Sequence, residues 1–386
     1  MPKTIKAAIF TDTIDEVNGI AYSCKGLIDW VAATHPPLEL TLFCLSRNTQ
    51  PTLLDQVRVL RYRPHLAFDM PGYKEHIAGL LPKRSIASDF AEGDFDVVHI
   101  LTPGKMSNFG RDLARKHNLP LVGTYFTRFP TFFREYVSRT IPVKGLLHLF
   151  DRYAIRRMRK TYGSCDIVLC QAGNFLAEVK QFYDGDVRVW TTGVDTKKFR
   201  PKDTGAPFRE RYGIKAKHVG LYVGRVALEK RLDALIDLKR DLSDLDFEVL
   251  VVGDGPYREE LEKKLDAVFA GCLTGEDLAD AYAAADFFLF PSDTDAYGIV
   301  VMESLAAGVP VIINAGSGAS ETVQACGAGY VYHKYDNLVK YSRRLCEEDD
   351  TRRSMADLGL EYARQYTWEH SSVELLDVYK ELTDKD

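Results

Sequence analysis

Two carboxylates eight residues apart, Asp295 and Glu303, form the pair in this chain that is best placed for ligand chemistry. They belong to residues 287–312, FFLFPSDTDAYGIVVMESLAAGVPVI, in which an apolar run, a short loop, a helical run and a second apolar run follow one another. On one continuing helix the two acids would lie about two turns apart on the same face. The loop would follow the carboxyl end of a parallel strand, where open α/β sheets bind ligands. We therefore expect the pair to accept hydrogen bonds from hydroxyl groups of a ligand.

The residues between the two acids are suited to an anion. Gly298 has no side chain, so the backbone N–H groups from Tyr297 to Ile299 can approach a ligand closely. At the start of a helix these groups and the helix dipole together favour negative charge, phosphate in particular. A sugar joined to a diphosphate would engage both the amides and the carboxylates. The alternative is an ordinary solvated loop that caps a helix.

Two cations in another segment match such a ligand. In GLYVGRVALEKRLD, Gly224 and Arg225 end an apolar run, and Lys230 follows the arginine by five residues. Cations beside a strand–helix turn can neutralise a diphosphate, whose negative charge grows as it leaves. Taken singly, each cation could equally be a surface charge.

The residues Asp293-Thr294-Asp295 form a D-x-D sequence, which could instead hold a divalent metal beside a diphosphate. Because Arg225 and Lys230 already supply positive charge in the same half of the chain, a metal is unnecessary. We predict a site that requires no metal and no separate cofactor.

A basic helix is the other segment with a chemical signature. The formal net charge is −5, yet residues 105–160 hold thirteen Lys and Arg against three Asp and Glu. Residues 144–160 carry an apolar stripe that includes Tyr153, Ala154 and Met158, and beside it a basic stripe of Arg152, Arg156, Arg159 and Lys160. This pattern is typical of an interfacial helix on anionic lipid. The alternative is a core-facing helix with a solvated basic face. Nucleic acid is a poorer partner, since the acidic remainder of the chain would repel a polyanion.

Alternating strands and helices must position all these residues. Near-continuously apolar runs, such as 97–101 and 249–252, are separated by segments with helical spacing, which indicates parallel sheets covered on both faces. The series restarts at 219–224, after a polar stretch that contains Pro and Gly. We predict an α/β fold with two Rossmann-like domains, residues 1–195 and 215–368.

The motifs closely resemble those of the retaining nucleotide-sugar glycosyltransferases of family 4, which have the two-domain GT-B fold. Residues 295–303 correspond to the family's D/E-x7-E segment, 224–230 to its G-R-x4-K, and 248–256 to a strand that ends in G-x-G-P. Residues 95–136 and 191–199 also match, so the resemblance covers nearly the whole chain. It implies transfer of a sugar from a nucleotide diphosphate to an acceptor hydroxyl, with retention of configuration.

The resemblance also implies roles for individual residues. Arg225 and Lys230 would bind the leaving diphosphate. Asp295 would hold hydroxyls of the transferred sugar, and Glu303 the ribose. Further donor contacts would come from Gly19, Gly224, Gly253, Gly271, Cys272, Tyr297, Gly298 and Ile299. The acceptor or sugar side would include Asp12, Tyr125, Phe126, Thr127 and Arg128. In this fold the last helix, 369–386, packs back on the first domain.

Three positions depart from the family pattern. Asp295 stands where the family usually has Glu, Phe126 replaces the histidine of a Y-H-T motif, and Thr192 replaces an Asn. The family histidine normally contacts the transferred sugar, often at its 6-position, so Phe126 leaves the identity of the sugar open. One hypothesis is a donor with a carboxylate there, such as a uronic acid, which would meet Arg128.

Partners and location complete the prediction. The basic helix and the aromatic-rich segment before it look like those of family members that glycosylate lipids. We expect a UDP- or GDP-sugar donor and an acceptor that is a membrane lipid or lipid-linked glycan. Because the opening MPKTIKAAIFTDT has no signal-peptide pattern and the seven cysteines are scattered, we expect a cytoplasmic protein with reduced thiols, bound peripherally to the inner membrane face. A soluble sugar-phosphate acceptor, a nucleotide-sugar epimerase and a non-catalytic binding protein of the same fold remain alternatives, and the oligomeric state is not predicted.

Overall fold

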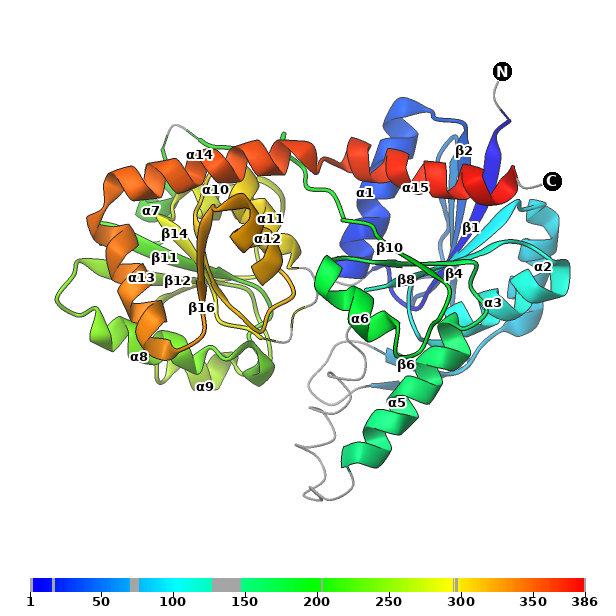
Figure 1. Ribbon diagram of the computed structural model, residues 1–386, viewed down its shortest axis with the longest axis horizontal. Coiled ribbons are helices and arrows are strands. Elements are labelled where there is room, and N and C mark those ends of the chain that lie inside the picture. Colours follow the sequence, from blue (N-terminus) through cyan, green and yellow to red (C-terminus); the bar gives the residue numbers. More distant parts are fainter. Residues whose placement is uncertain are drawn as a thin grey trace. The chain divides into compact units, whose positions relative to one another are not determined.

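The computed structural model describes residues 3–15, 18–69, 76–126, 147–202, 204–293, 295 and 298–384 (Figure 1). Its contacts divide the chain into two compact units. The first unit holds Met1–Gly193 and Trp368–Asp386, and the second unit holds Val194–Thr367. Each unit has a large, mostly parallel sheet with helices packed against it, so the predicted α/β class is confirmed.

The first unit is built on an eight-stranded sheet in the order β10-β9-β8-β7-β1-β2-β4-β3, counted over the described residues. Neighbouring strands are parallel except β3, which is antiparallel to β4. The strands are β1 (Ile5–Thr11), β2 (Leu38–Leu45), β3 (Thr52–Leu53), β4 (Val57–Tyr62), β7 (Val97–Ile100), β8 (Leu121–Tyr125), β9 (Ile167–Cys170) and β10 (Asp186–Val189). A separate antiparallel hairpin is formed by β5 (Leu66–Asp69) and β6 (His76–Leu80).

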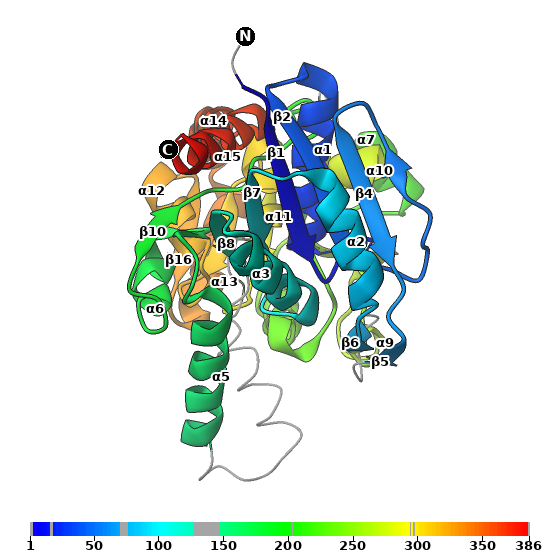
Figure 2. The same ribbon diagram turned by 90° about the vertical axis from the view of Figure 1, so that its right-hand side faces the viewer.

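Helices cover this sheet, and the last helix of the chain is one of them (Figures 1 and 2). They are α1 (Gly19–Thr34), α2 (Lys83–Gly93), α3 (Lys105–His117), α5 (Leu147–Tyr162), α6 (Leu176–Val179) and α15 (Trp368–Thr383), with a 3-10 turn at Gly173–Phe175. At the start of α15 the Trp368 indole lies so close to Gly26 that a Cβ on the glycine would sit 2.2 Å from the ring. Buried His99 on β7 lies 2.7 Å from the Tyr379 hydroxyl of α15 and 2.6 Å from the Thr124 hydroxyl of β8. The last helix is therefore part of the core of the first unit.

The second unit has a six-stranded sheet in the order β13-β12-β11-β14-β15-β16, with every pair parallel, over the residues described for it. Its strands are β11 (His218–Val223), β12 (Phe247–Val252), β13 (Val268–Gly271), β14 (Phe287–Phe290), β15 (Val311–Asn314) and β16 (Gly329–Tyr332). Its helices are α7 (Ala206–Arg211), α8 (Asp233–Asp241), α9 (Arg258–Glu262), α10 (Gly275–Ala283), α11 (Ile299–Ala306), α12 (Ser320–Cys326), α13 (Tyr335–Glu347) and α14 (Asp349–Gln365), with a 3-10 turn at Leu228–Lys230. Strands β11 and β14 are fully buried, as their apolar sequences predict.

Each sheet has a point at which the strand order reverses. In the first unit β1 lies between β7 and β2, and in the second unit β11 lies between β14 and β12. Open α/β sheets bind ligands outside the carboxyl ends of their strands at such a switch point. In the second unit this point lies where β11 and β14 end, at Val223 and Phe290.

None of the helices in the described ranges has both the length and the hydropathy that a bilayer crossing demands. All seven cysteines are free, and five of them are buried, whereas Cys272 is exposed.

Candidate active site

The candidate site begins with the two cations that follow β11. Arg225 directly follows Gly224, and the Tyr222 hydroxyl donates a 2.9 Å hydrogen bond to the Arg225 carbonyl oxygen. The Arg225 guanidinium donates to the Glu229 carboxylate at 2.5 Å, four residues further along the chain. This partner was not predicted, because residues 225–227 are not helical and the i, i+4 pairing of helices does not apply to them. Arg225 is thus oriented at both its backbone and its side chain.

Lys230 meets the first acid of the predicted pair. Its ammonium group donates a hydrogen bond to the carboxylate of Asp295, which lies 65 positions away in the sequence. Both side chains are largely buried, with 16% and 23% of their surface exposed. Burial by itself would raise the pKa of Asp295, but the charge and hydrogen bond of Lys230, helped by Ser292 and Arg225, outweigh it and lower that pKa. The structure therefore brings a predicted phosphate-binding cation and a predicted sugar-binding carboxylate together at the switch point.

A second ion pair lies next to the first. The Arg231 guanidinium contacts the carboxylate of Asp293, and Arg231 adopts a left-handed backbone conformation with φ of 55°. The two aspartates of the D-x-D sequence therefore each contact a cation from the segment after β11. In the described part of the chain, His, Cys, Asp and Glu form no group of three that could hold a metal ion. The sequence offered no signal for Arg231, because its pairing depends on two strands lying side by side.

Glycines allow the ends of the neighbouring strands to pack closely. Gly224 and Gly253 have φ of +151° and +138°, and a Cβ on Gly253 would lie 1.8 Å from the Gly224 carbonyl oxygen. The Gly253 N–H donates to the Gly271 carbonyl oxygen at 2.7 Å, and Gly271 itself has φ of +74°. The backbones of β11, β12 and β13 thus meet at the carboxyl edge, with Cys272 exposed just beyond. Close backbone packing accounts for these glycines, and contact of the same backbone with a donor stays a prediction.

The loop after β14 departs from the helical geometry that we expected. Helix α11 begins at Ile299, with Gly298 before it at φ of +69°, so Asp295 lies in the loop and not on the helix. The prediction that Asp295 and Glu303 share a face of one continuing helix is therefore wrong. The Asp295 carbonyl oxygen instead accepts a 2.9 Å hydrogen bond from the Gly318 N–H, which fixes the loop against the turn after β15. Tyr297, predicted to contribute its backbone, lies outside the described residues.

Glu303 is the most buried acid of the site. Its side chain is 4% exposed on α11, and the Tyr282 hydroxyl of α10 donates a 3.0 Å hydrogen bond to it. Burial raises the pKa of Glu303 to about 7, against the smaller lowering effects of Tyr282 and Lys198. The group therefore changes charge near neutral pH.

In the first unit, the Asp12 carboxylate caps the start of α3. Its carboxylate accepts hydrogen bonds from the Thr102 hydroxyl at 2.6 Å and from the Met106 N–H at 3.0 Å, at the first turn of α3. A Cβ on Gly104 would lie 1.8 Å from this carboxylate, so the glycine makes room for it. Burial raises the pKa of Asp12, while these hydrogen bonds oppose the shift. Both oxygens are engaged in the cap, and a role of Asp12 toward an acceptor stays a prediction.

Gly19 is the exposed first residue of α1. The side chain of Asn18 before it caps the helix by accepting hydrogen bonds from the N–H groups of Ile20 and Ala21, at 3.1 and 2.9 Å. Thr192, one of the three departures from the family pattern, is fully buried and donates a 2.5 Å hydrogen bond to Gln171. Contact of Gly19 with donor phosphates is a prediction.

Two of the predicted sugar-side residues lie at the end of β8. Tyr125 is buried, and its hydroxyl donates a 2.6 Å hydrogen bond to Glu178. Phe126 is half-buried and packs edge-on against Trp190, with 6.2 Å between the ring centres. Tyr125 therefore points into the core, whereas Phe126 keeps some exposed surface. Thr127 and Arg128 lie outside the described residues.

The predicted basic stripe lies on the exposed side of α5. Arg152, Arg156, Arg159 and Lys160 are all exposed, while Ala154 and Met158 are fully buried. Tyr153 was expected on the apolar stripe, but its side chain is 52% exposed. The buried face of the helix is formed at i, i+4 and i+8 by Ala154, Met158 and Tyr162, and Tyr153 is turned about 100° away from Ala154.

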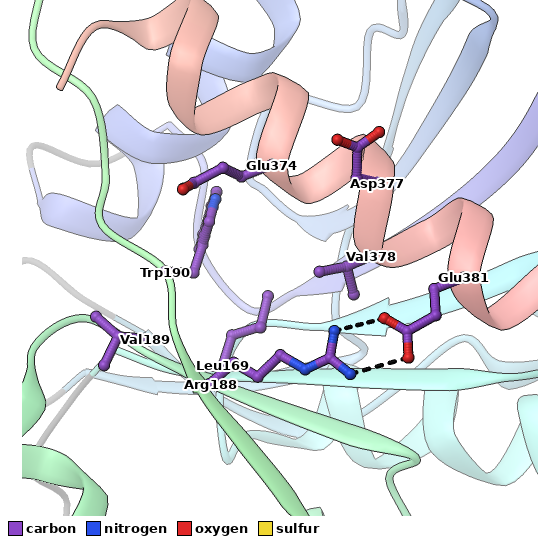
Figure 3. Close-up of a pocket in the computed structure, with 8 residues that line it drawn as sticks. All are labelled: Leu169, Arg188, Val189, Trp190, Glu374, Asp377, Val378 and Glu381. Carbon is purple, nitrogen blue, oxygen red and sulfur yellow. Dashed lines mark hydrogen bonds and ion pairs between the residues drawn. The ribbon is translucent and has the colours of Figure 1, made fainter. Parts of the chain in front are cut away.

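A surface pocket of about 280 Å³ also lies in the first unit, between β10 and α15 (Figure 3). Its main polar feature is Arg188, which donates two hydrogen bonds to Glu381, at 2.6 and 2.9 Å. This pair ties the last helix to the edge strand of the sheet. None of the site residues predicted from the sequence lines the pocket.

The comparisons with known proteins agree with this geometry. Residues 17–198 match the family described as Glycosyltransferase Family 4, and residues 207–361 match glycosyl transferases group 1. Sucrose-phosphate synthase from Thermosynechococcus elongatus superposes with a TM-score of 0.82 over 99% of this chain and 100% of that chain, at 19% identity. Anabaena HepE in complex with UDP and glucose gives a TM-score of 0.75 over 98% and 100%, at 16% identity. The chain therefore has the GT-B fold and belongs to the family 4, group 1 glycosyltransferases, as its motifs predicted.

Three relatives that are named for an activity share 25 to 27% sequence identity with this chain. Sulfoquinovosyl transferase SQD2 from Arabidopsis thaliana is 27% identical over 80% of this chain, which spans only 61% of the plant protein. A GDP-mannose-dependent alpha-mannosyltransferase from Corynebacterium glutamicum is 26% identical over 78% of this chain and 71% of that protein. Alpha-monoglucosyldiacylglycerol synthase from Acholeplasma laidlawii is 25% identical over 64% of this chain and 65% of that protein. The chain is thus a glycosyltransferase whose relatives include enzymes that act on lipids.

Proposed function

We propose that this protein transfers a hexosyl group from a UDP- or GDP-sugar to a hydroxyl of a membrane lipid or lipid-linked glycan at the cytoplasmic face of the membrane, with retention of configuration. The observation that carries the proposal is the contact between Lys230 and Asp295 at the switch point of the second unit. Such a donor carries a diphosphate next to a sugar. The contact places a cation suited to the diphosphate beside a carboxylate suited to the sugar hydroxyls.

The ion pairs suggest how the site exchanges partners. Without a ligand, Asp295 neutralises Lys230 and Glu229 neutralises Arg225, so neither cation is buried without a counter-charge. A donor diphosphate supplies new negative charge to Lys230 and Arg225, which leaves the Asp295 carboxylate available to sugar hydroxyls. The same cations stabilise the charge that grows on the diphosphate as the glycosidic bond breaks. The acceptor oxygen then bonds to the anomeric carbon from the face that the diphosphate leaves, while the leaving phosphate accepts the proton of the acceptor hydroxyl, so the configuration is retained.

A lipid acceptor is supported by α5 and by the relatives. Exposed Arg152, Arg156, Arg159 and Lys160 give one helix a basic surface suited to anionic headgroups. Among the relatives, one is named as a synthase of a glucosyldiacylglycerol. A small soluble sugar-phosphate acceptor would not require cations spread along a whole helix of the first unit.

The sugar itself is proposed to be acidic. Phe126, packed on Trp190, cannot donate the hydrogen bond that a histidine would offer to a neutral hydroxyl. The plant relative is named for a sulfoquinovosyl group, an acidic sugar. In a competition assay, UDP-glucuronate or another acidic nucleotide sugar should then bind better than UDP-glucose, and equal binding would exclude this part of the proposal.

The transfer is tested by a panel of UDP- and GDP-sugars, screened by thermal shift, because a ligand of the folded state raises the melting temperature. Stabilising donors are then incubated with lipid vesicles or with soluble sugar phosphates, and the products are identified by mass spectrometry and their anomeric configuration by NMR. We expect an α-linked glycolipid from an α-linked donor, together with the released nucleoside diphosphate. A new nucleotide sugar without release of nucleotide would indicate an epimerase, and binding without turnover would indicate a non-catalytic protein.

A further inference from the structure

The β5–β6 hairpin exposes two leucines on one face. Leu66 and Leu80 are cross-strand partners in this antiparallel pair, so their side chains point to the same side. Their exposed fractions are 53% and 56%, although leucine is among the residue types most often buried. The hairpin also stands outside the large sheet of the first unit. No described part of the chain therefore covers this apolar pair.

Basic residues flank the two leucines in the sequence. Arg63 and His65 precede Leu66, Lys83 and Arg84 follow Leu80, and all four side chains are exposed. Lys83 lies over the Phe109 ring at 5.5 Å, and Arg63 and Arg84 form no ion pair within the described residues. Leu66 and Leu80 lie at the open end of the hairpin, where β5 begins and β6 ends. An exposed apolar pair next to cations is complementary to a surface that is apolar inside and anionic outside. A soluble acidic protein would match the cations but would gain less from the leucines.

The hairpin and α5 lie at the same edge of the first unit. Strand β4 runs parallel to β2 and β1, and β5 begins four residues after β4 ends, so the hairpin follows the carboxyl edge of the sheet. Helix α5 is tied to that edge by Arg157, which donates a 3.1 Å hydrogen bond to the Pro103 carbonyl oxygen just after β7. Both views show α5 and the hairpin at this end of the unit (Figures 1 and 2).

We propose that Leu66 and Leu80 insert into an anionic lipid bilayer and anchor the first unit, while α5 and the cations around the hairpin contact the headgroups. This inference rests on the proposed function, because it identifies the surface through which a lipid-acting enzyme would reach its acceptor. The leucines supply the part of the binding that salt does not screen. The exposed arginines of α5 supply the part that salt does screen.

The test uses the full-length protein and vesicles made of equal parts phosphatidylglycerol and phosphatidylcholine. Leu66→Ser/Leu80→Ser should weaken flotation with these vesicles by about tenfold or more, because two apolar side chains no longer enter the bilayer. The matched control is Leu53→Ser/Leu54→Ser, which changes two leucines that are 65% and 43% exposed near the start of β4, at the opposite edge. At high salt the hairpin variant should still bind vesicles more weakly than the wild type does. Its circular dichroism spectrum should match that of the wild type.

Other outcomes would overturn the inference. Equal vesicle binding by the wild type and the hairpin variant would do so, as would equal losses in the hairpin variant and the control. A hairpin variant that sediments as a smaller species than the wild type, with vesicle binding unchanged, would assign the leucines to contacts between copies of this chain. Failure of the lipid-transfer proposal has a different signature, because the wild type would then bind vesicles and the donor but form no glycolipid.

Discussion

At the scale of single residues, the Lys230–Asp295 contact determines how the candidate site carries its charge. Under the proposed function the cation and the acid would each bind a different part of the donor, and without a ligand they contact one another. Removal of either partner leaves a largely buried charge without its counter-charge, which is costly. Effects on stability and on catalysis can therefore be separated by changing one partner or both.

We predict that Lys230→Ala lowers the free energy of unfolding by about 1–2 kcal/mol and lowers kcat/KM by roughly 100-fold or more. Asp295 would then lose the charge that lowers its pKa. Adding Asp295→Asn should restore part of the stability but none of the activity. The control is Lys239→Ala, whose partner Glu248 lies 2.8 Å away with similar burial at the amino edge of the sheet. That variant should lose stability and keep its activity, and loss of activity in both variants would contradict the assignment.

A second prediction concerns the pH dependence of Glu303. Burial raises its pKa to about 7 from an ordinary value of 4.5, so the folded protein binds a proton more tightly than the unfolded chain does. This contribution to stability is present at low pH and is lost as the pH rises through 7. Glu303→Gln should therefore be more stable than wild type at pH 8 by roughly 1–2 kcal/mol, and about equally stable at pH 5.

Chemical denaturation at the two pH values measures this difference, and calorimetric titration with the donor measures the function of the same group. The variant should bind donor about tenfold more weakly at pH 8, because a carboxylate is a stronger acceptor for ribose hydroxyls than an amide. Glu259→Gln, an exposed change on α9, serves as the control. A stability difference of the same size at pH 5 and pH 8 would show that Glu303 does not titrate in this range.

At the scale of elements, α5 separates membrane contact from chemistry. Its exposed arginines belong to the first unit, whereas the ion pairs of the candidate site belong to the second unit, so the arginines can be changed without changing those ion pairs. We predict that Arg152→Glu/Arg156→Glu weakens binding to anionic vesicles by about 1 kcal/mol or more for each cation removed, and that added salt masks the difference. Donor binding in the thermal-shift assay should not change.

The control for the α5 variant makes the same change of charge at another place in the first unit. Arg115→Glu/Lys116→Glu alters two exposed cations at the end of α3, next to the start of β8 and therefore at the opposite edge of the sheet. If this variant loses as much vesicle binding as the α5 variant, the net charge of the protein and not the α5 surface determines binding.

Elements also show how far the sequence could predict this protein. Buried parallel strands and the cations after β11 were recognisable because apolar runs and local spacing carry that information. The start of α11 at Ile299 was not, since a left-handed Gly298 and a hydrogen bond from Gly318 hold Asp295 in the loop. The Arg231–Asp293 pair and the position of His99 were also out of reach, because each joins segments that only the folded sheet brings together.

At the scale of the whole molecule, the last helix belongs to the unit at the start of the chain. This connection depends on a small polar cluster, in which His99 lies between the Tyr379 and Thr124 hydroxyls. The cluster is buried, and burial lowers the pKa of His99 to about 3, so the ring stays neutral and needs both hydroxyl partners. We predict that Tyr379→Phe lowers the free energy of unfolding by about 1–3 kcal/mol, because one ring nitrogen is left buried without a hydrogen bond.

The location of this effect is as informative as its size. Hydrogen exchange should become faster in β7, β8 and α15 of the Tyr379→Phe variant and stay unchanged in residues 206–361, because the two units have separate cores. The converse control is Tyr335→Phe, which removes a 2.8 Å hydrogen bond to Asp241 within the second unit. Donor binding should raise protection in the second unit of both variants. Faster exchange throughout the chain after either change would instead mean that the two units unfold as one, and that the last helix couples acceptor-side and donor-side stability.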